Sequence, residues 1–122
     1  MKFIGILALT AALLTVADIV DASEPARMVV AVRYVVSEQS PDRVEEKLTS
    51  PLERAFIGLV RVDSINSETS HGTVAIEIQF EGGATLQDLA AVNQRIKDFP
   101  TDPHITVTSR TAELAVASLL TQ

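Results

Sequence analysis

Apolar and polar residues alternate strictly in the segment TVAIEIQF, residues 73–80. Val74, Ile76, Ile78 and Phe80 occupy one set of positions, and the residues between them are mostly polar. A period of two is typical of a strand with one buried face. The run MVVAVRYVV, residues 28–36, is short, apolar and rich in β-branched residues, and it predicts a second strand. Two further strands are expected at 59–65 and at 104–109, the latter with Ile105 and Val107 facing inward.

Two segments have helical spacing of apolar residues. The first is predicted to begin at Pro41 behind an N-cap at Ser40 and to end near Ile57, before Gly58. The second is predicted to begin after Thr85, with Asp88 three residues later as in a capping box. Turns are expected at 66–72 and 81–84. The apolar stripe of the second helix is Leu86, Leu89, Val92, Ile96 and Phe99.

Pro51 lies inside the first helical segment, where a proline removes one backbone hydrogen bond and costs roughly 3 kcal/mol. The cost is tolerable if the carbonyl that loses its partner, that of Lys47, faces water. The alternative is that Pro51 starts a separate helix, with Ser50 as its cap and Glu53 in its first turn.

The element order β-α-β-β-α-β predicts an α+β, ferredoxin-like fold with a four-stranded antiparallel sheet and two helices on one face. Residues on the inner positions of these elements should form the core: Val30, Val32, Leu48, Leu52, Phe56, Val74, Ile76, Ile78, Phe80, Leu89, Ile96 and Val107. The other sheet face should be open and mildly polar, and should carry Ala31, Arg33, Val35, Thr73, Ala75, Glu77, Gln79, Thr106 and Thr108.

Composition limits the function classes. The chain has 122 residues, enough for one domain, and a net charge of −6, which argues against binding to nucleic acid or to anionic membrane surfaces. There is no cysteine, which excludes disulfides, thiolate metal sites and cysteine nucleophiles. Aromatic residues are few and there is no tryptophan, so an aromatic cage is not expected.

The N-terminal residues follow the pattern of a secretory signal peptide. Lys2 precedes an apolar run over 3–17, and Val20-Asp21-Ala22 provides a cleavage site before Ser23. The alternatives are an uncleaved membrane anchor, which would be the only membrane association, or a buried helix of a cytosolic domain. The expected organisation is therefore a signal peptide or anchor at 1–22, an α/β domain at 23–110 and a C-terminal tail at 111–122.

No constellation of residues indicates an enzyme. His71 and His104 lack spaced ligand partners, so neither a metal site nor a catalytic histidine is expected. Glu45 and Glu46 are interpreted as a solvated helix face. There is no G-x-S-x-G segment and no phosphate-binding glycine loop. The sequence therefore predicts no catalytic residues and no cofactor.

Several short motifs occur together in a distinctive order. Ser40-Pro41 opens the first helix, Val44-Glu45-Glu46 follows, and Thr49-Ser50-Pro51-Leu52-Glu53 lies in its middle. A glycine, a strand rich in Val and Ser, and the strand that begins at Gly72-Thr73 come next. Over roughly residues 28–114 the chain resembles the first periplasmic porter subdomain of resistance–nodulation–division (RND) efflux transporters. In that family a proline occupies the position of Pro51.

The resemblance implies a function and a surface for it. It implies a non-enzymatic, exported porter subdomain, a fragment or accessory of a transmembrane efflux system that does not transport alone. RND transporter subunits or another periplasmic protein would be its partners. The alternative is a free-standing periplasmic module that binds a small apolar ligand or a protein on the open sheet face. By the resemblance, the residues bordering a substrate path or docking face are Arg33, Val35, Glu77, Gln79, Thr108 and Arg110.

The sequence also departs from the family pattern. Val36-Ser37-Glu38 stands where the family has Tyr-Pro-Gly, so the turn after the first strand is expected to differ. The family has small polar residues where this chain has Arg33, Glu77 and Arg110. The twelve membrane helices and the intramembrane acids of a full transporter have no counterpart in these 122 residues.

Overall fold

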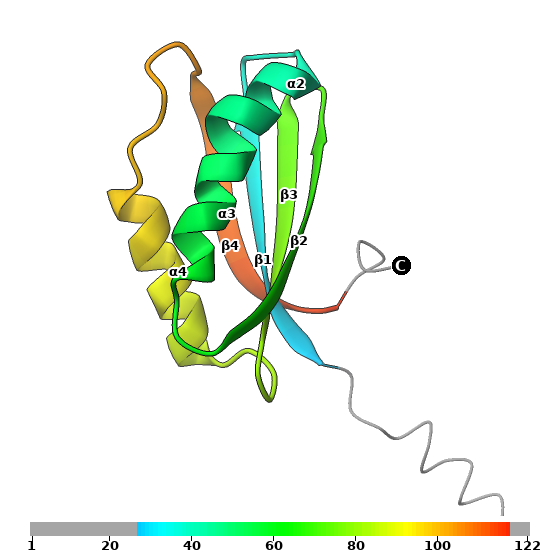
Figure 1. Cartoon of the computed structure of the whole chain (residues 1–122), viewed down its shortest axis with the longest axis vertical. Coiled ribbons are helices and arrows are strands. Elements are labelled where there is room, and N and C mark those ends of the chain that lie inside the picture. Colours follow the sequence, from blue (N-terminus) through cyan, green and yellow to red (C-terminus); the bar gives the residue numbers. More distant parts are fainter. Residues whose placement is uncertain (1–26, 118–122) are drawn as a thin grey trace, which may run out of the picture.

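The computed structural model describes residues 27–117 as a single sheet with helices packed on one side (Figure 1). The elements in chain order are β1 (Met28–Val36), α2 (Pro41–Val44), η1 (Glu45–Thr49), α3 (Ser50–Ile57), β2 (Val62–Ser70), β3 (Thr73–Phe80), α4 (Leu86–Asp98) and β4 (Val107–Val116). Since α2, η1 and α3 follow one another without a break, they form one long helical segment.

The four strands are ordered β2-β3-β1-β4, and every neighbouring pair is antiparallel. The helical segment from α2 to α3 and the helix α4 lie on the same face of this sheet (Figure 1). The predicted α+β, ferredoxin-like arrangement is therefore confirmed, as are the bounds of β1 and β3.

The expected bounds of the other two strands were wrong. β2 continues through residues 66–70, which were expected in a turn, because this polar stretch pairs with residues 73–77 and leaves a tight turn at His71-Gly72. Gly72 has a φ of +78°, which favours glycine at that point. β4 begins at Val107 and extends to Val116, so residues 111–116, expected in the tail, pair with β1 down to Met28.

The helix passes through Pro51 by widening just before it. The N–H of Ser50 donates to the carbonyl of Glu45, five residues back, so Glu45–Thr49 forms a π-type turn. In this spacing Pro51, which has no N–H, would have bonded to the carbonyl of Glu46, and Glu46 is exposed. Ser50 and Thr49 both have helical backbone angles and neither side chain caps α3, so a separate helix starting at Pro51 is wrong.

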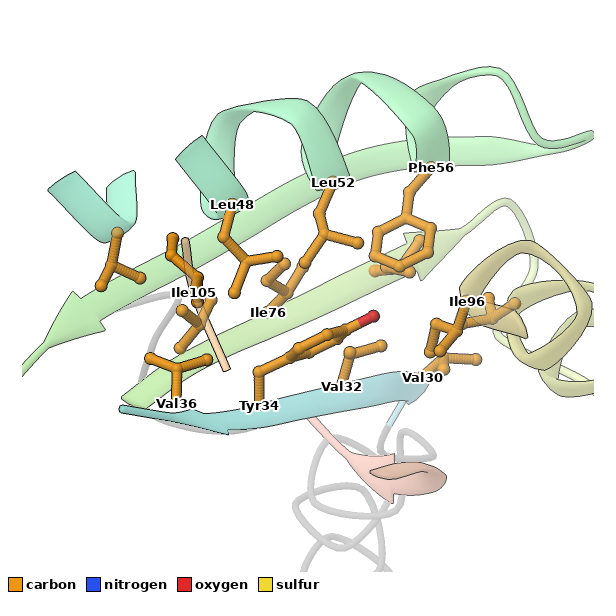
Figure 2. Packing of buried hydrophobic residues seen from close by; sticks show 14 of the residues in the cluster. Val30, Val32, Tyr34, Val36, Leu48, Leu52, Phe56, Ile76, Ile96 and Ile105 are labelled. Carbon is orange, nitrogen blue, oxygen red and sulfur yellow. The ribbon is translucent and has the colours of Figure 1, made fainter. Parts of the chain in front are cut away.

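The core lies between the sheet and the helices (Figure 2). Figure 2 shows Leu48, Leu52 and Phe56 descending from the helical segment onto side chains of β1 and β3. Of the residues expected in the core, Leu89 and Val107 are only partly buried and pack at its margin. The remaining ten are buried: Val30, Val32, Leu48, Leu52, Phe56, Val74, Ile76, Ile78, Phe80 and Ile96.

Polar bonds join the helical segment to the edge strand β2. The buried Thr49 hydroxyl is 2.8 Å from the Thr69 hydroxyl, which donates to Glu45 Oε1 at 2.8 Å. In the same way, Ser67 of β2 donates to a carboxylate oxygen of Glu53 in α3. Hydrogen-bonded hydroxyls therefore take the place of apolar side chains where the inner face of β2 meets the helix.

Candidate functional site

The residues proposed for a substrate path or docking face were expected on the sheet face opposite the helices or, for Arg110, in the segment after the last strand. The strand register places four of them there. Val35 is opposite Thr73, Arg33 is opposite Ala75, and Glu77 is opposite Ala31. Gln79 is opposite Ser64 of β2. Directly opposed residues of antiparallel strands project to the same side, so Arg33, Val35, Glu77 and Gln79 share one face.

Two rows of residues cross the middle of this face. One row runs Glu68, Ala75, Arg33 and Thr111, and the next runs Asn66, Glu77, Ala31 and Glu113. Arg33 is therefore the single cation in two rows that contain three glutamates. The face favours cationic or hydrogen-bonding groups over anionic ones.

The face is not uniformly open. Glu77 is only 3% exposed and Val29, on the same face of β1, is fully buried, whereas Arg33 is exposed. Val35 and Gln79 are half-buried. A shallow depression of about 300 Å³ lies over the middle strands, with Arg33, Glu77, Thr111 and Glu113 among the residues that line it.

Thr108 and Arg110 do not join the other four, and a β-bulge is the reason. Val36 pairs with Val107, but Val35 pairs with Ser109, so Thr108 is an extra residue between two ladder pairs. The Thr108 hydroxyl donates to the carbonyl of Val35 at 3.1 Å. Because the extra residue reverses the alternation, Arg110 comes opposite Tyr34 on the helix side of the sheet. Arg110 was expected just after the last strand, and it lies inside the longer β4.

The same shift brings other residues to the open face. Ser109, Thr111 and Glu113 of β4 take the positions opposite Val35, Arg33 and Ala31. Asn66 and Glu68 arrive from β2, since that strand extends through the stretch expected as a turn. The alternation in TAELAV, with Ala112, Leu114 and Val116 on one side, was the available signal for a longer β4.

Arg110 instead lies beside the buried side chain of Tyr34. The Tyr34 hydroxyl is buried and has no hydrogen-bond partner with acceptable geometry within residues 27–117. Burial raises the pKa of Tyr34 above its ordinary value, and the positive charge of Arg110 opposes part of that rise. Arg110 therefore acts on Tyr34 through its charge more than through a formed bond.

The histidines lie apart from this face. His71 Nδ1 is 3.0 Å from the carbonyl of Gln39, and His104 is 3.8 Å from Asp102. Over the part of the chain that the structure describes, no three His, Asp or Glu side chains converge as metal ligands. Within 27–117 there is also no helix with the length and apolarity needed to cross a membrane.

The sequence matches a family model, and the fold matches solved structures. The model of the AcrB/AcrD/AcrF family matches residues 1–112. Two similar structures are crystal forms II and I of a heavy metal efflux pump, with TM-scores of 0.61 and 0.59 and sequence identities of 22% and 21%. At this identity the structural likeness establishes the fold alone. A comparison with curated proteins gave no match.

The structural match covers most of this chain but only a small part of the pump chain. It covers 91% of this chain but 12% of the pump chain in both crystal forms. The chain therefore spans about an eighth of the length of the pumps that it resembles.

Proposed function

The chain belongs to the AcrB/AcrD/AcrF family, and from this premise we propose that it is a non-enzymatic porter subdomain of an RND efflux system. It works as a part of a transmembrane efflux assembly, or as an accessory to one, and does not move substrate by itself. The observation that carries the proposal is the coincidence of the family match over residues 1–112 with one ferredoxin-like unit over residues 27–117.

The proposed location is the periplasm. Support comes from the signal-like order of Lys2, the apolar run 3–17 and Val20-Asp21-Ala22. These residues lie outside those that the structure describes. The family match includes them, which also supports the rival reading of an uncleaved anchor in the inner membrane with the domain in the periplasm.

The proposed docking surface is the sheet face that carries Arg33, Val35, Glu77 and Gln79. The exposed Glu68 and Glu113 and the single arginine in its two central rows suit a polar or cationic partner surface and do not suit a small apolar ligand. The alternative of a free-standing module for an apolar ligand is therefore the weaker reading. Thr108 contributes only at the edge of this surface, through the bulge.

A cross-linking experiment in a Gram-negative host tests both the location and the partner. A photo-reactive amino acid replaces Arg33 on the docking surface or, as a control, exposed Lys97 on α4. We expect only the Arg33 variant to give an adduct with a membrane protein that mass spectrometry identifies as an RND transporter. Equal adducts from both positions, or none from Arg33, would contradict the proposed docking surface.

N-terminal sequencing of the same fractions decides the location. A mature chain that begins at or near Ser23 in the periplasmic fraction supports export. An intact Met1 in the membrane fraction supports the anchor, and an intact Met1 in the cytosolic fraction contradicts both.

A further inference from the structure

A pocket with a volume of about 360 Å³ lies at the end of the domain where the β1–α2 loop meets the loop before β4. Both loops lie at the upper end of Figure 1. The pocket is lined by Glu38, Arg43, Lys47, Asp102, Pro103, His104 and Ile105. It shares no residue with the docking surface and does not depend on the proposed function.

The wall formed by the second loop is held in place by several bonds. The N–H of Ser37 donates to the carbonyl of Thr106 at 2.9 Å, and the N–H of Thr106 donates to Ser37 Oγ at 3.2 Å. The N–H of Ile105 donates to the carbonyl of Asp102 at 3.0 Å. The Ile105 side chain is buried in the core. The pocket is thus shaped before any ligand arrives.

Its two carboxylates are already occupied by backbone donors. Glu38 Oε2 accepts from the N–H of Ser40 at 3.1 Å. Asp102 Oδ1 accepts from the N–H of His104 at 2.8 Å and lies 3.8 Å from the His104 ring. These bonds hold the two acids against their own loops, and within residues 27–117 neither acid forms an ion pair with Arg43 or Lys47.

The two cations of the pocket, unlike its acids, have no hydrogen-bond partner among the described residues. Arg43 and Lys47 are four positions apart on the helical segment, and both line the pocket. Among residues 27–117, neither side chain makes an ion pair or a hydrogen bond. Pro103 and the small exposed part of Ile105 line the same pocket, which therefore has a charged part and an apolar part. Arginine pairs with carboxylates through parallel hydrogen bonds, and lysine adds a mobile positive charge.

We propose that this pocket binds a small organic carboxylate, with the carboxylate between Arg43 and Lys47 and the apolar body against Pro103 and Ile105. The volume of about 360 Å³ lies in the range of small-molecule pockets, so the pocket has room for an organic anion. Benzoate, a carboxylate on an apolar ring, is a simple probe of this chemistry.

Titration of the full chain with benzoate, followed by the NMR amide signals of His104 and Ile105, tests the proposal. We expect saturable shifts with a Kd in the millimolar range or below, and binding of the neutral isostere benzamide to be weaker by about tenfold or more. The double variant Arg43→Gln/Lys47→Gln should weaken benzoate binding by at least about tenfold. The control Arg54→Gln/Lys97→Gln, which removes the same charge at exposed positions, should leave the Kd within about twofold.

Each other outcome would overturn the site. These outcomes are shifts that do not saturate by about 20 mM, equal affinity for benzamide, and unchanged affinity in the Arg43/Lys47 double variant. Both variants alter only exposed side chains, and their amide spectra report directly whether they remain folded. Since the readout is local to the pocket, its failure leaves the efflux proposal untouched, and failure of the cross-linking leaves the pocket untouched.

Discussion

Arg61 Nη1 lies 2.9 Å from both carboxylate oxygens of Asp88, and joins the turn before β2 to the start of α4. Arg61 has a φ of +68° and also donates through Nη2 to the carbonyls of Glu81 and Gly83. Asp88 completes a capping box with Thr85. Burial of Asp88 acts to raise its pKa, but the bonds from Arg61 and Thr85 outweigh it and hold that pKa below its ordinary value.

Asp88→Asn should destabilise the domain by about 1–2 kcal/mol at neutral pH, through loss of the helix cap and of the ion pair. The ion pair contributes only a small part, because Arg61 is partly exposed and solvent screens its charge. A carboxylate with a depressed pKa contributes stability above its unfolded pKa, near 3.8, and loses it as pH falls through the folded pKa. The difference from wild type should therefore be full at pH 6 and shrink below about pH 4. Urea denaturation at several pH values measures it, with exposed Asp63→Asn as the control. A pH-independent difference would contradict the ionic role.

Phe56→Ala should cost about 3–5 kcal/mol, because it removes a fully buried ring and leaves a cavity. Phe80→Ala, 1% exposed, should behave alike. The neighbouring Ile57 is 57% exposed and serves as the matched control, with an expected cost for Ile57→Ala below about 1 kcal/mol. Thermal melting compares the three variants. If Phe56→Ala melts within a few degrees of wild type, the packing of α3 on the sheet is wrong.

Pro51→Ala should be neutral or stabilise the domain by up to about 1 kcal/mol. The variant restores a backbone N–H and removes the clash of the ring, and these gains exceed the extra freedom of the unfolded chain. Ser50→Ala should cost only a few tenths of a kcal/mol, because the exposed Ser50 hydroxyl bonds to Glu45 Oε2 and does not cap a helix. Chemical denaturation of both variants checks this pair of results. A loss of about 1 kcal/mol in each would instead favour a new helix starting at Pro51.

Tyr34→Phe should stabilise the domain by about 1 kcal/mol, because it removes a buried hydroxyl that forms no hydrogen bond among residues 27–117. Tyr34 is the sole tyrosine of the chain, so its phenolate absorbance can be titrated without interference. We expect a pKa above 10 in the wild type and a higher one in Arg110→Gln, since Arg110 lowers it. An unchanged pKa in Arg110→Gln would place Arg110 away from the hydroxyl.

The sequence predicts those elements whose pattern is set by burial on one face. β3 alternates without exception and its bounds are correct. The capping box at Thr85 and Asp88 follows from local chemistry and is present. Leu86 fits the apolar stripe of α4 but is 74% exposed, at the first residue of the helix. The periodicity of apolar residues alone does not show which positions of a helix are covered by the sheet.

The wrong bounds of β2 and β4 have a single kind of cause. A bulge at Thr108 adds one residue to β4, and the side of the sheet on which Arg110 lies depends on that one residue. Likewise, hydroxyls at Ser67 and Thr69 look like a turn in sequence, but in the fold they find partners on the helix. Such partners come from distant parts of the chain, so a local pattern does not reveal them.

The π-type turn at Glu45–Thr49 has a consequence for how this helix tolerates changes in length. Val44, Leu48, Leu52 and Phe56 recur every four residues, and in a regular α-helix each such step overshoots a full turn by about 40°. In the wide turn each residue rotates the chain by a smaller angle, which offsets part of this overshoot. The wide turn also contains one residue more than a turn of α-helix. A single-residue deletion of Glu46 can therefore be taken up by conversion of the turn to regular helix, with the added cost that the regular turn then meets the ring of Pro51. The same deletion within Leu52–Phe56 would rotate Phe56 by about 100° out of the core.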